Sequence, residues 1–183
     1  MFKILTVRDK VRVTPEKFGS DVMESIKQSI QEQIEGKLNQ NIGMFLATTE
    51  IIKVSEGEIL PEDGAIHYTV EFKILAYVPE LNEIVLGEVV DAAEFGAFVR
   101  IGPFDAMIHV SQMMEDKVTY NEKTFTFVGK KSGKKLQKED MVRTRIVGVS
   151  LGKSGRNKVS LTMRQPCLGT LVDIEKGKKG KKS

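Results

Sequence analysis

Two phenylalanines, a histidine and several glycines lie close together between Gly87 and Ser111. Phe95 and Phe98 fall on one predicted strand and His109 ends the next, and both rings reach the outer face if Gly96 permits a local bulge. A base stacked on an exposed aromatic ring contributes about 1–3 kcal/mol with little sequence preference. The pattern therefore predicts a stacking surface for single-stranded nucleic acid. The alternative is that both rings are core residues and His109 only ends a strand.

Short predicted strands position these residues. They cover Glu83 to Asp91, Phe95 to Ile101, Phe104 to His109, Met141 to Val149 and Lys158 to Met163. Five strands in this order indicate an OB-type barrel, which binds oligonucleotides on its second and third strands. Residues 112–138 form an insert with an expected extra hairpin over Lys117 to Val128 and a basic turn over Gly129 to Lys135. That turn either extends a nucleic-acid path electrostatically or keeps a strand edge soluble.

The N-terminal residues predict a separate α+β domain, with one helix on an antiparallel sheet. Strands are expected over Phe2 to Val13, Ile42 to Val54 and Ala65 to Val78. Thr14-Pro15-Glu16 is a helix-start pattern, and Gly36 is the expected C-terminal cap. The apolar stripe of the helix consists of Val22, Ile26, Ile30, Ile34 and Leu38.

A turn-rich loop from Gly57 to Gly64 carries two apolar residues, Ile59 and Leu60, at its expected tip. Exposed apolar residues at a tip suggest a docking site for another protein. The alternative is that both side chains fold back onto the sheet.

The chain has an expected division into domains and a separate asymmetry of charge. We expect a domain over residues 1–80, a barrel domain over 81–166 and a tail over 167–183, of which Glu175 to Ser183 is expected to be disordered. Residues 1–116 hold 10 basic and 20 acidic side chains, whereas residues 117–183 hold 18 basic and 5 acidic ones. This asymmetry favours a polyanionic partner at the basic end and a different partner at the other.

Neither catalysis nor a cofactor is expected. The two histidines, His67 and His109, fall in different predicted domains, and Cys167 has no adjacent base. No cluster has metal-ligand spacing and no phosphate-binding loop motif occurs. No apolar run approaches the roughly 20 residues of a membrane span. A single cysteine and the lack of a signal region suggest a reducing, cytoplasmic location.

The barrel segment resembles the S1 RNA-binding motif. The resemblance rests on Gly87-x-Val89, Phe95-Gly96-Ala97-Phe98-Val99, His109-x-Ser111 and Lys158 to Met163. It implies that RNA contacts Phe95, Phe98, His109 and Lys158. We also expect Arg143 and Arg145, on the strand that resumes at Asp140, to contact RNA.

The whole chain resembles the larger stalk subunit of archaeal RNA polymerase, E-prime or RpoE, the counterpart of the seventh subunit of eukaryotic polymerase II. This rests on Met1 to Leu5, Pro15 to Gly19, Glu35-Gly36-Lys37 and Leu161 to Pro166, together with the barrel motifs. The resemblance implies a non-catalytic subunit that pairs with RpoF, the smaller stalk subunit, docks on the polymerase core and holds emerging single-stranded RNA. It further implies roles in initiation, elongation and termination.

The resemblance also implies a core-facing tip formed by Glu35 to Gly43 and by Gly57 to Gly64, with Gly57, Ile59, Leu60 and Gly64 as the docking loop. The alternative function is a stand-alone S1-type RNA-binding factor in translation or RNA decay. The N-terminal domain discriminates the two, because a free-standing factor does not need an apolar-tipped loop.

Overall fold

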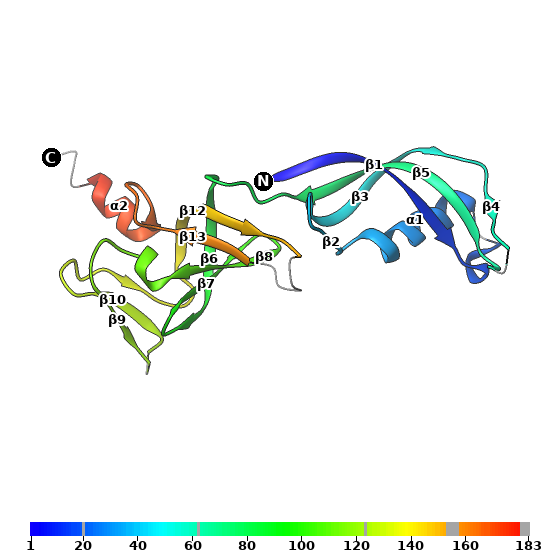
Figure 1. Cartoon of the computed structure of the whole chain (residues 1–183). Coiled ribbons are helices and arrows are strands. Elements are labelled where there is room, and N and C mark those ends of the chain that lie inside the picture. Colours follow the sequence, from blue (N-terminus) through cyan, green and yellow to red (C-terminus); the bar gives the residue numbers. More distant parts are fainter. Residues whose placement is uncertain (20, 62, 123, 153–157, 180–183) are drawn as a thin grey trace. The chain divides into compact units, whose positions relative to one another are not determined.

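The computed structural model describes residues 1–19, 21–61, 63–122, 124–152 and 158–179, and it divides into two units, Met1–Val78 and Pro79–Ser183. Figure 1 labels the elements of both units. The α+β fold class predicted from the sequence is confirmed, with one helix on a sheet in the first unit and a barrel in the second. No helix in the described ranges combines the length and apolar character needed to span a bilayer.

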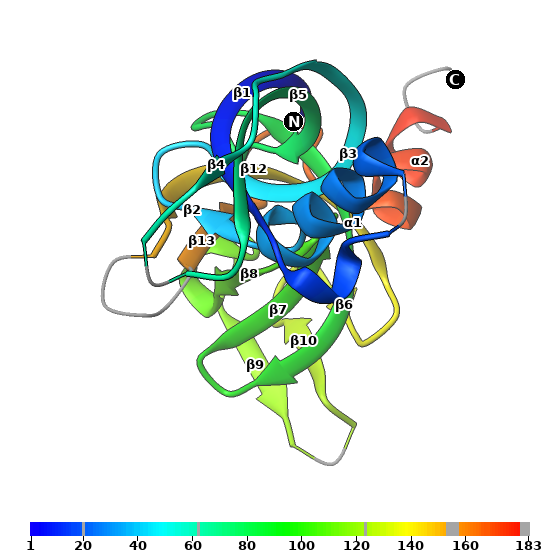
Figure 2. The same cartoon turned by 90° about the vertical axis from the view of Figure 1, so that its right-hand side faces the viewer.

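The first unit is an antiparallel sheet with one long helix packed on it. Its strands are β1 (Phe2–Val13), β2 (Leu38–Asn39), β3 (Gly43–Val54), β4 (Glu58–Ile59) and β5 (Ile66–Tyr77). The sheet order is β1-β5-β3-β2, and the short strand β4 also pairs with β5. Figures 1 and 2 show the helix α1 (Val22–Ile34) lying along β1, β5 and β3.

The core of this unit lies between the helix and the sheet. It consists of Val11, Val13, Ile26, Ile30, Ile34, Phe45, Val70, Phe72, Ile74 and Ala76. Three of the five residues in the predicted stripe are therefore core residues. Val22 is exposed at the first turn and Leu38 belongs to β2, so the stripe is shorter than predicted.

The helix starts later than its sequence signal. Pro15–Lys17 forms only a short 3-10 turn (η1), and α1 begins at Val22. Gly19, with φ of +110°, turns the chain out of helical geometry between the two. Gly36 adopts φ of +74° just after the helix ends, as predicted for a capping glycine.

The second unit is a six-stranded barrel sheet with an inserted three-stranded sheet. The barrel strands are β6 (Ile84–Ala93), β7 (Gly96–Ile101), β8 (Phe104–His109), β12 (Met141–Ser150), β13 (Lys158–Thr162) and β14 (Gly169–Thr170). Their order is β13-β8-β7-β6-β12-β14, and the additional pairing of β13 with β12 closes the barrel. Strands β13 and β8 run parallel, whereas the other pairs are antiparallel.

The insert follows a 3-10 turn, η2 (Val110–Gln112). It contains β9 (Val118–Asn121), β10 (Thr126–Gly129) and β11 (Lys135–Leu136), which pair in the order β11-β10-β9. Phe127 and Leu136 are fully buried, so the insert contributes its own buried apolar side chains.

The C-terminal tail differs from its prediction. Helix α2 covers Leu171–Lys179, so the expectation of disorder from Glu175 onward is wrong as far as Lys179, and residues 180–183 lie outside the described residues. The helix begins where the Asp173 N–H donates to Thr170 Oγ1 at 3.3 Å. Glutamate and lysine are good helix formers, which accounts for the helical backbone in a segment with few apolar residues.

Two glycines allow strands of the barrel to approach closely. A Cβ at Gly96 would lie 2.4 Å from the Ile108 carbonyl oxygen, and one at Gly87 would lie 2.5 Å from Val99 Cγ1. The predicted bulge is not at Gly96, because the register shift lies across from β7, between Val89 and Asp91 of β6. Position 96 requires glycine for a different reason, which is that the backbone of β8 lies too close to leave room for a side chain.

Gly96→Ala should therefore destabilise the barrel by about 1–3 kcal/mol, since the new methyl group must displace backbone. Urea unfolding of the full chain would measure the loss. Gly148→Ala is the control, because its Cβ would meet Ser160 Cβ at an ordinary 3.5 Å. Equal stability of the Gly96 and Gly148 variants would contradict the packing argument.

Candidate nucleic-acid interface and docking loop

The outer face of β7, β8 and β13 brings four of the predicted RNA-binding residues together. Phe95 lies in the turn before β7 with 53% of its surface exposed, and Phe98 is half-buried on β7. Their ring centroids are 6.0 Å apart and the planes are at 87°. This edge-to-face pair holds the Phe95 ring in the open rather than in the core.

Strand register determines which side chains share this face. Phe98 pairs with Met107 of β8, and Met107 pairs with Ser160 of β13. All three are half-buried, as expected for one outward row of the barrel. Met107 was missed by the sequence analysis, although its spacing of two from His109 on β8 places the two on the same face.

His109 lies beside Gly96 in the next row and is oriented by its neighbours. The Ser111 backbone N–H donates to His109 Nδ1 at 3.2 Å, and Ser111 Oγ lies 2.8 Å from the same nitrogen. Because Nδ1 accepts a hydrogen bond, the ring proton lies on Nε2. The exposed ring therefore presents a stacking face and an N–H donor.

A cation–carboxylate row borders the aromatic residues. Arg100 Nε donates to Asp105 Oδ1 at 3.0 Å across β7 and β8. Hydrogen bonding to Asp105 raises the pKa of Arg100 above its usual value. Lys158 starts β13 two residues before Ser160, so the parallel register places this exposed lysine on the same face, beside Asp105.

The two predicted arginines lie farther around the barrel. Arg145 pairs with Thr162 of β13 on one side and with Ile84 of β6 on the other, so one strand separates it from β8. Arg143 pairs with Leu86 and Gly169, towards β14. The structure thus gathers Phe95, Phe98, His109 and Lys158, places Arg145 at their margin and places Arg143 outside the group.

The predicted docking loop forms the end of the first unit near β4. Ile59 is 74% exposed and Leu60 is 44% exposed, so neither side chain folds back onto the sheet. A Cβ at Gly57 would lie 2.6 Å from Ile66 Cγ2, so this position requires glycine. Gly64 has no such constraint, because the atom nearest to an added Cβ is 3.8 Å away.

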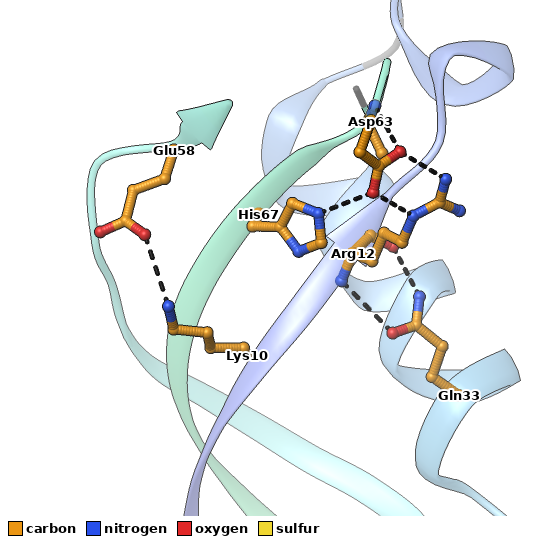
Figure 3. Close-up of polar contacts among 7 residues, drawn as sticks. Lys10, Arg12, Gln33, Glu58, Asp63 and His67 are labelled. Carbon is orange, nitrogen blue, oxygen red and sulfur yellow. Dashed lines mark hydrogen bonds and ion pairs between the residues drawn. The ribbon is translucent and has the colours of Figure 1, made fainter. Parts of the chain in front are cut away.

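A carboxylate at the base of the loop holds it to the sheet (Figure 3). Arg12 donates from Nε to Asp63 Oδ2 at 2.9 Å and from Nη2 to Oδ1 at 2.7 Å. His67 Nε2 lies 2.9 Å from Asp63 Oδ2, and the Ala65 N–H donates to Oδ1 at 3.2 Å. Hydrogen bonds from Arg12 and then His67 hold the pKa of Asp63 well below its usual range.

Further contacts extend this polar cluster to the helix and the neighbouring strand. The Arg12 N–H donates to Gln33 Oε1 at 3.3 Å, and the Gln33 side-chain amide donates back to the Arg12 carbonyl. Lys10 Nζ lies 3.5 Å from Glu58 Oε2. Sequence reasoning missed the cluster, because its members are far apart in the chain.

The second predicted tip loop lies elsewhere. Asn39 and Gly43 pair next to Tyr77 at the end of β5, whereas Glu58 and Ile59 pair with His67 and Ile66 at its beginning. The loops at 35–43 and 57–64 are therefore at opposite ends of a twelve-residue strand. A single tip composed of both loops is wrong for this domain.

In the described ranges, no group of three or more His, Cys, Asp or Glu side chains is placed to hold a metal ion.

Comparison with known proteins identifies both units. Residues 8–64 match the family described as "SHS2 domain found in N terminus of Rpb7p/Rpc25p/MJ0397", and residues 78–164 match "S1 RNA binding domain". The resemblance stated from the sequence is confirmed by relatives along nearly the whole chain.

Three relatives illustrate this. DNA-directed RNA polymerase subunit Rpo7 of Saccharolobus shibatae is 37% identical over 180 residues, which cover 98% of this chain and 100% of that protein. Rpo7 of Sulfolobus acidocaldarius is 34% identical and covers 93% of each chain. DNA-directed RNA polymerase III subunit RPC8 of Bos taurus is 26% identical over 67% of this chain and 60% of its own length.

Asp63→Asn should lower the free energy of unfolding at neutral pH, and the difference from the unsubstituted protein should shrink as the pH falls below about 4. The depressed pKa in the folded state means that the carboxylate stabilises the fold above its unfolded pKa of about 3.9 and loses this effect in acid. Urea unfolding at a series of pH values measures both curves. Asp9→Asn removes a carboxylate from the same strand as Arg12 without touching the loop and should show no matching trend. A pH-independent effect of Asp63→Asn would contradict the assignment.

Proposed function

Because this chain belongs to the family of archaeal RNA polymerase subunit Rpo7, we propose that it is a non-catalytic stalk subunit that binds emerging single-stranded RNA through its barrel. The observation that carries the proposal is the exposed Phe95–Phe98 pair, with His109 and Lys158 on the same outer face of an S1 unit. The nucleotidyl transfer reaction belongs to other subunits of the enzyme. The protein acts in the cytoplasm, where it supports initiation, elongation and termination.

RNA binding on this face combines stacking with charge. The rings and the imidazole offer faces for successive bases, which bind with little sequence preference. Lys158 and, at the margin, Arg145 supply cations for the phosphate backbone. Arg143 has less support, because it stands beside Leu86 and away from the rings.

Polymerase association uses the other unit and a separate surface. The exposed Ile59 and Leu60 form an apolar tip that the Arg12–Asp63 pair fixes to the sheet. Such a tip fits an apolar recess in the polymerase core, where burial of each side chain contributes about 1.5–3 kcal/mol. A stand-alone RNA-binding factor would have no use for this tip, so the loop favours the stalk role.

Pairing with RpoF, the smaller stalk subunit, needs a further protein-binding surface. Exposed apolar residues on adjacent barrel strands supply one on the outer face of β6 and β12, namely Ile84, Leu86 and Met141. Arg143 and Arg145 pair with Leu86 and Ile84 on this face, so the apolar residues supply the protein contact while Arg145 lies at the edge nearer to the RNA-binding face.

Phe95→Ala should weaken binding of single-stranded RNA about tenfold, since one stacking interaction is lost. Adding Phe98→Ala should weaken it further, with thermal unfolding as a check on the half-buried position. Phe125→Ala is the matched control, because Phe125 is a similarly exposed ring at 54% in the β9–β10 turn. Fluorescence anisotropy measures the affinities. Equal affinity of the Phe95 variant and the unsubstituted protein would refute the stacking surface.

Ile59→Asp with Leu60→Asp should impair co-purification with the polymerase core, because two carboxylates would be buried in an apolar recess. RNA affinity of the isolated chain should remain unchanged. Ile52→Asp, at an exposed isoleucine outside the loop, is the control. Normal assembly of the double variant would remove the loop from the interface.

A further inference from the structure

The basic turn of the insert has a defined conformation. Lys130, Lys131 and Lys134 are exposed on the turn that joins β10 to β11, and Lys135, also exposed, is the first residue of β11. The Gly129 N–H donates to the Lys134 carbonyl at 2.9 Å, and the Gly133 N–H donates to the Gly129 carbonyl at 3.0 Å. Gly133 adopts φ of +66°, which favours glycine. Three cations therefore lie on a closed, hydrogen-bonded turn, and a fourth follows it directly in the chain.

Asp116 holds this turn from outside. Its Oδ2 accepts the N–H of Lys131 at 2.6 Å, the N–H of Ser132 at 2.8 Å and the Ser132 hydroxyl at 3.2 Å. Backbone hydrogen bonds, first from Ser132, lower the pKa of Asp116. The carboxylate thus accepts hydrogen bonds from the turn and orients its backbone N–H groups.

The turn and Asp116 pack closely against Gly129, with no room for a side chain at this position. A Cβ at Gly129 would lie 2.6 Å from Ser132 Oγ and 3.0 Å from Asp116 Oδ2. The same position would lie 3.2 Å from Met114 Sδ. The glycine is therefore required for the carboxylate to reach the turn.

A cavity of about 940 Å³ opens beside the turn. Ser132 and Lys134 of the turn line it, together with the segment from Met163 to the first turn of α2. Apolar side chains make up much of its lining, including Met113, Met114, Met163, Leu168 and Ile174. A volume of this size fits within the range of ligand sites, and thioether side chains adapt to flat ring systems.

The cavity begins one short turn away from the end of the aromatic face of the barrel. Arg164 lines the cavity, and its Nη1 donates to the Ser111 carbonyl at 3.4 Å. Ser111 in turn orients the His109 ring. Only the short turn η2 therefore separates the end of the stacking face from the start of the cavity.

We propose that the lysine turn and the adjoining methionine-lined cavity form a second RNA-binding segment, which takes the nucleotides that follow those stacked on Phe95, Phe98 and His109. Phosphates contact the turn lysines and Arg164, and one base enters the cavity against the methionines. Asp116 is a positioning residue that fixes the lysines along this path. The inference rests on the proposed RNA-binding function of the barrel and extends it to a surface outside β7 and β8.

The chemistry favours RNA over a protein segment as the occupant. A peptide helix needs only the apolar lining, whereas three lysines on an ordered turn, a fourth beside it and an arginine at the junction match a chain of phosphates. Continuity with the stacking face gives the strand a route into the cavity. Three acids, Glu115, Asp116 and Asp173, line the cavity together with the cations Lys134 and Arg164, so the charge that the RNA meets depends on where the turn holds its lysines.

RNA length separates the second segment from the first. OB folds bind about 4–16 nucleotides, so oligouridines of about 4 and about 16 nucleotides test the stacking face alone and both segments together. In the full chain, K130Q/K131Q/K134Q should weaken binding of the longer RNA and spare the shorter one. The slope of log affinity against log salt for the longer RNA should fall by about 2, at about 0.7 per lost phosphate contact.

The control removes the same charge from the first unit, as K27Q/K37Q/K53Q, and should leave both RNAs unaffected. If the turn variant loses the same affinity for both RNA lengths, the lysines act only through nonspecific charge, and the proposal is overturned. Unchanged binding of the longer RNA would overturn it too. Loss of polymerase co-purification with intact RNA binding would identify a protein interface instead.

The sign of the Asp116→Asn effect tests the positioning role. Removing a negative charge should strengthen RNA binding if the turn acts only through its charge, whereas losing a held turn should weaken it. We expect weaker binding of the longer RNA and faster hydrogen exchange at the Lys131 and Ser132 amides. Glu115→Gln removes a neighbouring charge from the same cavity without altering the contacts of Asp116 and should show neither effect. Stronger or unchanged binding with Asp116→Asn would overturn this role.

Failure of the proposed function is distinguishable from failure of this inference. Phe95→Ala should weaken both RNA lengths, because both occupy the stacking face. If it weakens neither, the stacking face is refuted, and a loss confined to the longer RNA in the lysine variant still supports the turn. If it weakens both and the lysine variant weakens neither, only the second segment is refuted.

Discussion

Strand β8 approaches β7 so closely at Gly96 that no side chain fits between them, and the placement of the aromatic rings depends on this contact. The pairing of Gly96 with His109 sets the register, and that register then places Phe98 beside Met107 on the outer face. A shift of one residue would exchange the inner and outer faces of β7. Phe95 and Phe98 would then lose their common exposed setting. The predicted nucleic-acid surface is thus a result of backbone packing as much as of aromatic composition.

Much of the fold follows from local pattern in the sequence. The long strands of the first unit and the barrel strands were predictable because apolar alternation and turn residues bound each of them. Helix α2 was not, since a lysine-rich segment with little apolar surface has the composition of a disordered tail. The later start of α1 depends on Gly19, whose positive φ carries no signal in the sequence alone.

The candidate site was predictable in its residues and less so in its geometry. Phe95, Phe98, His109 and Lys158 share one face, as the barrel pattern implies. The separation of Arg143 from them depends on its pairing with Leu86 and Gly169, which only the strand order reveals. The contacts of Asp63 and Asp116 join distant segments, so no spacing rule finds them. Both carboxylates fix a loop with exposed side chains, which we propose as contacts for a partner.

Strand β5 has a mechanical consequence. Twelve residues in extended conformation span roughly 40 Å, and the strand pairs with β1 along its whole length and with β3 over much of it. A load applied along the strand axis would be shared by two ladders of backbone hydrogen bonds. A lengthwise load must break many hydrogen bonds of a ladder together, so the ladder resists it better than a load that opens the bonds one at a time. The first unit is accordingly stiff along β5, which keeps the loops at 35–43 and 57–64 a fixed distance apart.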